Sequence, residues 1–399
     1  MSQIVNRVLA LISLCFVYSF TAVAQVVETD NILGPIVTIE SEVLGDERTI
    51  QIYLPESYEN GKEEYPVLYI LDGQRYFLHG VSLAKTFEEF RETPPFIIVG
   101  ISKNPSDRNT QYSRNSIAYL QHIKTEVIPY LTNHFRVSSE RILFGWAFAG
   151  GFTINSLIND PLLFDSYIAA SPFPVKDKSS GIDSLFAANS DWDGLLFFTS
   201  GKNEGLVWEE TSALNELLSS KHSNLNLQFV ELTNEEHRST PFTTLYHGLQ
   251  KHFEYYPEPQ FNSLDEFLES GGLDYVFDYY GKRSERYGFP NKLSDWTMFS
   301  ITRNAIRAEN FHQFDALYTT FEKTGFISRL RVSRACSIAG FYHQNQQYNH
   351  AIELFQTIAN SHPNSTQPFI GLMAAYKVLG DEEKAKECLK KVQELKKSE

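Results

Sequence analysis

The sequence predicts an α/β fold, with a mostly parallel sheet covered by helices on both faces, followed by an all-α module. Two observations support this prediction. Between Ile36 and about Phe253, short β-rich runs alternate with helical stretches, as in a parallel sheet whose strands are joined by crossover helices. Beyond about residue 300 the pattern is helical, and residue types recur there at a fixed interval.

Eight strands are expected in the first part of the chain. The first two are polar and alternating, which is typical of an antiparallel edge. The runs at 67–71 and 96–100 are apolar and indicate strands buried on both faces. The expected strands are Ile36–Val43, Thr49–Leu54, Pro66–Leu71, Phe96–Ile101, Arg141–Phe144, Tyr167–Ala170, Leu195–Ser200 and Asn226–Leu232.

The helical module carries a repeat. Positions of similar type recur 34 residues apart, as in tetratricopeptide repeats, which are pairs of antiparallel helices. A plain helical bundle is the alternative, because Ala, Phe and Tyr at helical spacing describe any amphipathic helix. The matched intervals favour repeats. The matched pairs are Tyr342 with Tyr376, Ala351 with Ala385, and Phe355 with Leu389; Pro363 closes this unit, and Ala316, Tyr318 and Phe321 mark a more degenerate unit before it.

The predicted organisation has four parts. Residues 1–24 resemble a signal peptide, with Arg7, an apolar run from Val8 to Val23 and a small-residue cleavage site ending at Ala24. A membrane anchor is the rival interpretation, but Ser and Thr interrupt the apolar run. An exported protein, periplasmic or secreted, is therefore expected. The other parts are an α/β domain at 25–255, a connecting segment at 256–295 and the helical repeats at 296–399.

Composition limits the partners. The formal net charge is −14, which argues against nucleic acid or an anionic membrane surface as a partner, since both call for basic patches. After the first residues no stretch is apolar and long enough to span a bilayer. The mature chain would hold only Cys336 and Cys388, too few for a disulfide framework. Free thiols are the favoured state, and a single bridge stays open.

One segment matches a nucleophile elbow except at the nucleophile. Residues 141–151 read RILFGWAFAGG, which is a strand, a Gly two residues before the central position, a small residue two after it, and then a helix. The central position is Ala147. Alanine has no lone pair to attack an acyl carbon, so the covalent serine mechanism cannot run there.

An acid and a histidine follow in the order found in α/β-hydrolases. Glu204 follows the strand at 195–200, and His237 follows the strand at 226–232. Alone, each would be an ordinary turn carboxylate or histidine. Their positions after successive strands favour a catalytic dyad. His247 and His252 sit poorly on one helix face and no carboxylate completes a ligand set, so neither a metal site nor a cofactor is expected.

With these motifs the chain resembles the putative-esterase family of α/β-hydrolases, which includes bacterial siderophore esterases, esterase D and mycolyltransferases. The segment 274–289 followed by helical repeats is similar to that family's longer branch. The matching segments are Tyr65–Gly73, Val99–Ile101 followed by Arg108, Val127–Tyr130, Phe164–Pro172 and His237–Pro241.

The resemblance implies a role for each matching position. It makes Ala147 the degenerate nucleophile position, Glu204 the acid and His237 the base, with backbone N–H groups near Gly73 or Gln74 and at Phe148 as the oxyanion hole. The family's usual Gly-His-Ser-x-Gly-Gly differs from residues 145–150 at three of six positions.

Two functional hypotheses follow. In the first, the chain is a non-catalytic relative that keeps its pocket for a small ester or acyl ligand and uses the repeats for a protein partner. In the second, it is a working esterase on acyl or siderophore-like esters, in which Glu204 and His237 activate water or another residue is the nucleophile; Ser171 is the nearest serine by family analogy. Asp72 and Arg108 either line the pocket or form a structural ion pair.

Overall fold

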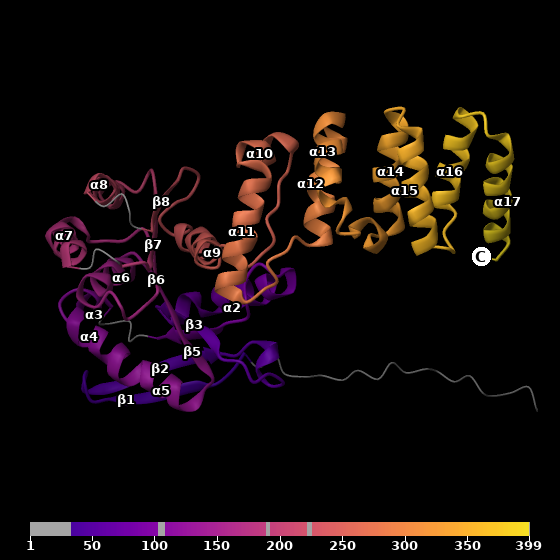
Figure 1. Cartoon of the computed structure of the whole chain (residues 1–399). Coiled ribbons are helices and arrows are strands. Elements are labelled where there is room, and N and C mark those ends of the chain that lie inside the picture. The colour runs from indigo at the N-terminus through magenta and orange to yellow at the C-terminus, as the bar shows by residue number, and fades with distance from the viewer. Residues whose placement is uncertain (1–32, 103–107, 189–191, 222–225, 399) are drawn as a thin grey trace, which may run out of the picture.

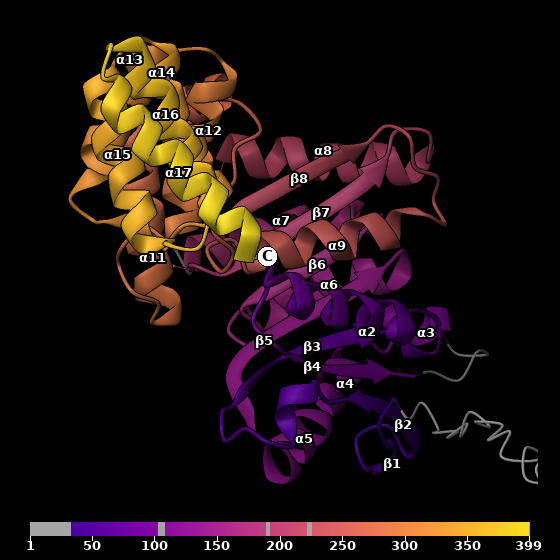
Figure 2. The same cartoon turned by 90° about the vertical axis from the view of Figure 1, so that its right-hand side faces the viewer.

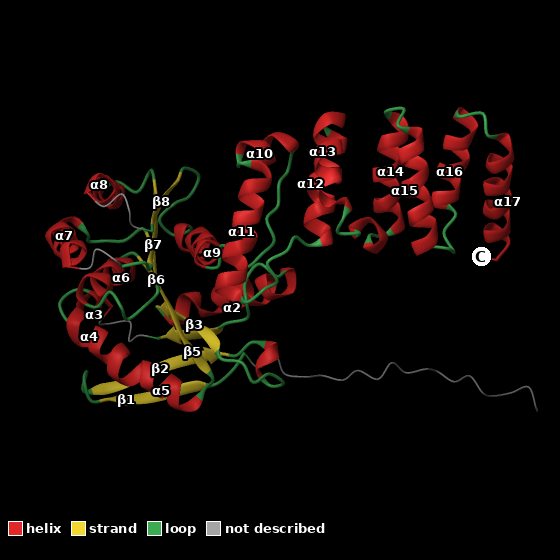
Figure 3. Cartoon of the chain, viewed as in Figure 1, coloured by secondary structure: helices red, strands yellow, loops and turns green. Residues whose placement is uncertain are grey.

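The computed structural model describes residues 33–102, 108–188, 192–221 and 226–398. The expected signal peptide lies outside these residues. The described part contains one eight-stranded sheet and a long helical extension (Figures 1 and 3).

The sheet has the order β1-β2-β4-β3-β5-β6-β7-β8. The β1–β2 and β2–β4 pairs are antiparallel, and every later neighbour pair is parallel. All eight predicted strands are confirmed, including the antiparallel edge. Their bounds are β1 Ile36–Ser41, β2 Asp46–Tyr53, β3 Tyr65–Leu71, β4 Ile97–Ile101, β5 Val137–Trp146, β6 Ser166–Ala170, β7 Leu195–Gly201 and β8 Leu227–Leu232.

Helices cover both faces of the sheet because alternate side chains of the central strands point to opposite faces. In β3, Leu68 and Ile70 join the core under α2 (Gly73–Phe90) and α9 (Thr240–His252), whereas Val67, Tyr69 and Leu71 join the core on the opposite face. That face is covered by α3 Arg108–Tyr112, α4 Ser116–His122, α5 Ile128–His134, α6 Phe148–Asn159, α7 Ser179–Ala188 and α8 Leu206–Lys221.

The helical extension consists of consecutive antiparallel helices stacked side by side (Figure 1). Tyr342 and Tyr376 lie in the first helices of successive pairs, α14 and α16, and Ala351 and Ala385 lie in the second helices, α15 and α17. The all-α character is confirmed; assignment to tetratricopeptide repeats stays a prediction. The bounds are α10 Leu264–Glu269, α11 Gly272–Tyr287, α12 Asp295–Arg307, α13 Phe311–Glu322, α14 Val332–Gln344, α15 Tyr348–Ser361, α16 Gln367–Val378 and α17 Glu382–Ser398.

The helical module contains the two cysteines of the described chain, and its last helix leaves one apolar side chain exposed. Cys336 and Cys388 are free and partly buried, and burial raises the pKa of the Cys336 thiol to about 11. The last helix buries Val392, whereas Leu389, which pairs with Phe355 in the repeat, is 41% exposed. No helix within the described residues is both long and apolar enough to span a membrane.

The core of the helical module begins before α12. Side chains from the predicted connecting segment belong to it, namely Phe261, Leu264, Phe267, Val276 and Tyr280. Two hydrogen bonds reinforce this packing. The Asn304 side chain donates to the Phe261 carbonyl at 2.8 Å, and the hydroxyls of Tyr280 and Thr297 lie 2.8 Å apart.

A polar cluster joins the module to the edge of the sheet where the parallel strands begin. Glu140, in β5, accepts from Arg286 of α11 at 2.9 Å and lies 2.9 Å from Nε2 of His252 in α9. The Ser166 hydroxyl of β6 lies 2.6 Å from Nδ1 of His252. Burial lowers the pKa of His252; burial also raises that of Glu140, but His252 and Arg286 outweigh it and bring the Glu140 pKa to about 2.

This packing predicts where the helical module can be cut. A fragment of residues 296–399 lacks the five apolar side chains named above, and should be less stable than a fragment of residues 258–399 by at least about 5 kcal/mol. Urea unfolding followed by circular dichroism measures the difference. Equal stability of the two fragments would show that α10 and α11 are only a linker.

Candidate active site

Ala147 occupies the turn between β5 and α6 in a strained conformation. Its φ is 54° and its ψ is −117°, a region that L-residues rarely adopt. Three backbone hydrogen bonds hold it there: its N–H donates to Ala170 at 3.0 Å, and its carbonyl accepts from Gly151 at 2.8 Å and from Phe173 at 3.1 Å. The backbone therefore keeps a nucleophile elbow although the side chain is a methyl group, which is 6% exposed.

Glycines allow α6 to pack closely enough to form this turn. A Cβ on Gly145 would lie 2.4 Å from the carbonyl oxygen of Ala149, and one on Gly151 would lie 2.6 Å from that of Phe173. Both distances are far shorter than van der Waals contact, and backbone atoms cannot move aside as a flexible side chain would. The glycines flanking Ala147 are therefore required by packing.

Glu204 and His237 are brought together at the same edge of the sheet. Glu204 lies in the turn between β7 and α8, and its Oε2 contacts Nδ1 of His237. Its other oxygen accepts from the Gly201 N–H at 2.5 Å and the Ser171 hydroxyl at 2.8 Å. The Glu204 side chain is only 2% exposed, whereas that of His237 is 39% exposed. A buried carboxylate thus orients a histidine that solvent can reach.

Trp146, which precedes Ala147, anchors the histidine loop to the elbow. Its indole N–H donates to the His237 carbonyl at 2.8 Å, and the two rings lie 4.8 Å apart. The Thr240 hydroxyl donates to the same carbonyl at 3.2 Å. Trp146 is one of the three positions at which residues 145–150 differ from the family motif, and this contact was not predicted from the sequence. The sequence did show an indole N–H next to the elbow, and a donor at that position could have suggested a hydrogen bond to a neighbouring loop.

Ser171 supports the acid. Its side chain is fully buried, its hydroxyl donates to Glu204, and it lies 2.7 Å from the Thr240 hydroxyl. Because this hydroxyl is fully buried and is engaged by Glu204 and Thr240, an ester carbonyl cannot approach it without disturbing the acid. The geometry therefore gives no support to Ser171 as an alternative nucleophile.

Two helix N-termini point at this edge of the sheet. Strands β3 and β5 are adjacent and parallel, and α2 and α6 begin directly after them. Gln74 is the second residue of α2 and Phe148 is the first of α6, so their N–H groups have no acceptor within their own helices. Gly73 must be a glycine, because a Cβ there would lie 2.5 Å from the carbonyl carbon of Gly100. The proposed oxyanion-hole donors thus come from two neighbouring helix starts.

Asp72 and Arg108 form an ion pair that connects these two strands. Asp72 is fully buried at the end of β3, and its Oδ2 accepts from Nε and Nη2 of Arg108 at 2.8 and 2.7 Å. Nη2 of Arg108 also donates to the Trp146 carbonyl at 3.1 Å, at the end of β5. The Tyr112 hydroxyl lies 3.3 Å from Oδ1 of Asp72. Of the two roles considered for this pair, the structure shows the ion pair, and it adjoins the elbow.

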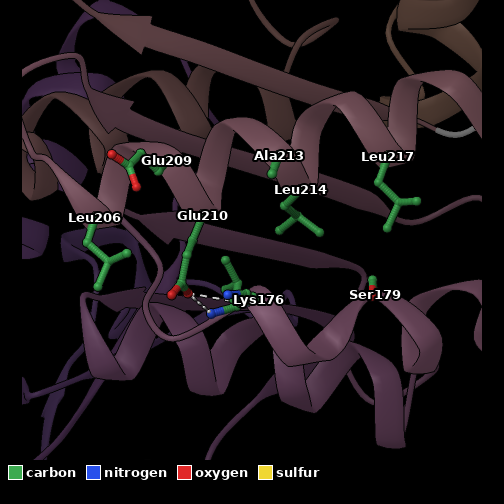
Figure 4. A pocket seen from close by; sticks show the side chains of 9 residues that line it. Lys176, Ser179, Leu206, Glu209, Glu210, Ala213, Leu214 and Leu217 are labelled. Atoms are coloured by element: carbon green, nitrogen blue, oxygen red, sulfur yellow. Dashed lines mark hydrogen bonds between the residues drawn. The ribbon is translucent and has the colours of Figure 1, made fainter.

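A groove of about 400 Å³ lies beside the site, between α8 and the segment that leads into α7 (Figure 4). Glu210 lines the groove, and its carboxylate accepts hydrogen bonds from the backbone N–H groups of Val175 and Lys176 at 2.9 and 3.1 Å. Leu206, two residues after Glu204, lines one end, but Ala147, Glu204 and His237 do not line it. The groove is therefore adjacent to the dyad without containing it.

His247 and His252 both lie on α9 but in different surroundings. His247 is exposed and contacts Gln250, whereas His252 lies buried in the polar cluster at the opposite edge of the sheet. Within the described ranges, no group of three or more His, Cys, Asp or Glu side chains is arranged to hold a metal ion.

The comparison with protein families identifies this architecture. Residues 41–248, more than half of the chain, match the family described as Putative esterase. The chain belongs to the putative-esterase family. The matched range includes the elbow, Glu204 and His237, which are the features that the sequence analysis used for the same resemblance.

One curated relative is the uncharacterized protein YbbA of Bacillus subtilis (strain 168), 24% identical over 140 residues, which are 31% of this chain and 56% of YbbA. Among solved structures, an IroE-like serine hydrolase from Shewanella oneidensis is 22% identical with a TM-score of 0.53, covering 73% of this chain and 99% of that one. Siderophore hydrolase EstA from Aspergillus nidulans is 17% identical with a TM-score of 0.50, covering 56% of this chain and 95% of EstA. At these identities the structural likeness shows the fold.

A third structure resembles the two-part organisation. An uncharacterised protein from Capnocytophaga ochracea is 16% identical with a TM-score of 0.53, and the match covers 90% of this chain and 93% of that one. A match of that extent must include part of the helical module as well as the sheet. The combination of the two parts is therefore present in another solved structure.

The packing at the elbow yields a stability prediction. Gly145→Ala should lower the free energy of unfolding by about 2–3 kcal/mol, because the new methyl group collides with the Ala149 carbonyl. Gly281→Ala is the matched control: it lies in α11 with nothing within 4 Å of the new Cβ, and should leave stability unchanged or raise it by about 1 kcal/mol. Chemical denaturation of both variants beside the parent measures the effect, and equal stabilities would contradict the packing constraint.

Proposed function

We propose that this chain binds an ester or acyl ligand at the former nucleophile site of an esterase-type hydrolase without forming a covalent acyl-enzyme. The observation that carries this proposal is Ala147 in the backbone conformation of a nucleophile, beside the Glu204–His237 pair. A methyl group can neither attack an acyl carbon nor give up a proton. Ser171, bound to the acid, offers no replacement.

Retention of the surrounding architecture supports a binding role. The strained turn, the glycines, the buried acid and the two helix starts are all present although the covalent step is missing. Strain of this kind costs on the order of 1–3 kcal/mol and persists only where the surrounding structure enforces it. Ligand binding gives this arrangement a use that does not require the hydroxyl.

Hydrolysis by activated water is the second candidate, and the exposure of His237 favours it. Water can reach the 39% exposed imidazole, and Glu204 orients that imidazole as in a hydrolase. In serine enzymes, loss of one triad member leaves a rate roughly a thousandfold above that in water. The substrates would be acyl or siderophore-like esters, a class suggested by the siderophore hydrolase among the structural neighbours.

The proposal extends to location and partners. The signal-like leader supports export of the chain, either to the periplasm or out of the cell. The 34-residue interval and the paired helices support tetratricopeptide-like repeats as a surface for a protein partner.

The proposed function predicts very low esterase activity. The chain should hydrolyse p-nitrophenyl acetate at a rate barely above that in buffer and should not react with a fluorophosphonate probe, because no hydroxyl sits at the elbow. Mass spectrometry after probe treatment checks the second point. Stoichiometric labelling of any serine would refute the proposal and would identify the true nucleophile.

The dyad predicts a gain of function. Ala147→Ser should raise kcat/KM for p-nitrophenyl acetate by at least about tenfold, because it places a hydroxyl next to a histidine already oriented by Glu204. The gain stays far below that of an intact enzyme if Trp146 shifts the turn, since about 1 Å of misplacement costs on the order of a hundredfold.

Two comparisons give this experiment its controls. Ala147→Ser combined with His237→Ala should lose the gain. A single variant no more reactive toward the fluorophosphonate than the parent would show that the dyad is not poised. Ester hydrolysis by the parent that His237→Ala abolishes would instead establish direct water activation.

A further inference from the structure

The site keeps the backbone N–H groups that would form an oxyanion hole, although the serine whose attack would create the oxyanion is replaced by Ala147. The N–H groups of Gln74 and Phe148 open the helices α2 and α6 at the same edge of the sheet as His237. In a serine hydrolase, donors in these positions stabilise an oxyanion that forms on attack by the hydroxyl. Here residue 147 cannot attack, so no oxyanion forms by that route, and a ligand that already carries a negative charge would satisfy the same donors.

The dyad can present a third donor. Glu204 contacts Nδ1 of His237, so that nitrogen carries its proton toward the carboxylate, and Nε2 is the ring nitrogen left to meet a ligand. A protonated imidazole donates through Nε2, and the buried Glu204 carboxylate compensates its positive charge. In the intact triad the serine hydroxyl would meet this nitrogen. With a methyl group at Ala147, a ligand oxygen can take that place.

Two cations and a second aromatic ring lie close to Trp146, which precedes Ala147. The Arg108 guanidinium lies 5.4 Å and that of Arg75 lies 5.8 Å from the centroid of the Trp146 ring. Asp72 pairs with Arg108, and Glu204 pairs with His237. Arg75 therefore adds a positive charge beyond these two pairs. Tyr76 packs edge-on against Trp146 at 5.9 Å, which makes one wall of the site aromatic.

We infer that the elbow site binds the carboxylate of an aromatic or apolar carboxylic acid, with one oxygen at the paired helix starts and the other at His237. This inference rests on the proposed function, which it deepens by naming the ligand class. A carboxylate supplies two oxygens that share one negative charge, which matches donors on both sides of the missing hydroxyl. A neutral ester or amide offers only one comparable acceptor. The apolar part of the acid packs on Trp146.

Calorimetric titration of the full chain with benzoate and with benzamide tests this inference. The two probes have nearly the same shape, but only benzoate is charged. Benzoate should bind at least about tenfold more tightly, because hydrogen bonds to a charged group are about twice as strong as neutral ones. Equal affinities, or no saturable binding of benzoate, would overturn the inference.

Substitutions test which side chain causes the preference for benzoate over benzamide. His237→Gln should remove most of the preference for benzoate, while the loop stays anchored, because Trp146 bonds the backbone carbonyl of residue 237 and not its side chain. His247→Gln is the matched control, since His247 lies exposed on α9 and contacts only Gln250 among the hydrogen bonds described for it. Ala147→Ser should weaken benzoate binding, because its hydroxyl takes the place of a ligand oxygen. A preference that survives His237→Gln would place the carboxylate elsewhere.

Methyl benzoate separates this inference from the function on which it rests. If the parent chain converts methyl benzoate to benzoate, the non-catalytic function fails, whatever the affinity for the acid. If benzamide binds as tightly as benzoate and no ester is turned over, ligand binding stands and the choice of a carboxylate fails.

Discussion

The close packing of α6 on β5 and β6 is the constraint on which the rest of the site depends. Gly145 and Gly151 bring backbone atoms so near one another that no side chain fits, and this contact forces Ala147 into positive φ. The same contact sets the start of α6, and with it the direction of the Phe148 N–H. Because the turn is determined by its neighbours, it retains its geometry when the central residue loses its chemistry.

The acid and the histidine depend on the elbow through a short chain of contacts. The Ala147 N–H bonds Ala170, the last residue of β6, and Ser171 follows directly and bonds Glu204. Trp146, next to Ala147, donates a hydrogen bond to the carbonyl of His237 and so connects the histidine loop back to the elbow. Each of these groups is held by a contact with at least one of the others, so the acid and the histidine are oriented before any ligand binds.

The sequence was sufficient for most of the fold because period-2 and apolar runs identify buried strands directly. All eight strands, and the positions of Ala147, Glu204 and His237 after β5, β7 and β8, follow from local patterns. The contacts of Ser171 with Glu204 and of Trp146 with His237 could not be predicted in this way. They join residues 33 and 91 positions apart, and the register of strands and turns that brings them together is a property of the folded chain.

The connecting segment illustrates a different limit. Residues 256–295 carry many aromatic, Gly and Pro residues, which mark a boundary in the sequence. In the structure Phe261 and Tyr280 pack into the same core as the helices that follow. Composition reveals where strand periodicity stops, but which neighbouring core receives an aromatic side chain depends on tertiary packing.

Strand β5 carries Glu140 near its beginning and ends at Trp146, beside Ala147. Six residue steps of extended chain span about 20 Å, so the attachment of the helical array and the elbow lie near opposite ends of the same strand. Figure 2 shows the array on the side where the parallel strands begin. A macromolecule held by the array would therefore bind on the side of the sheet opposite the elbow. Mechanical load applied to the array through Arg286 and Glu140 would reach the elbow along β5, a strand hydrogen-bonded to a neighbour on each side.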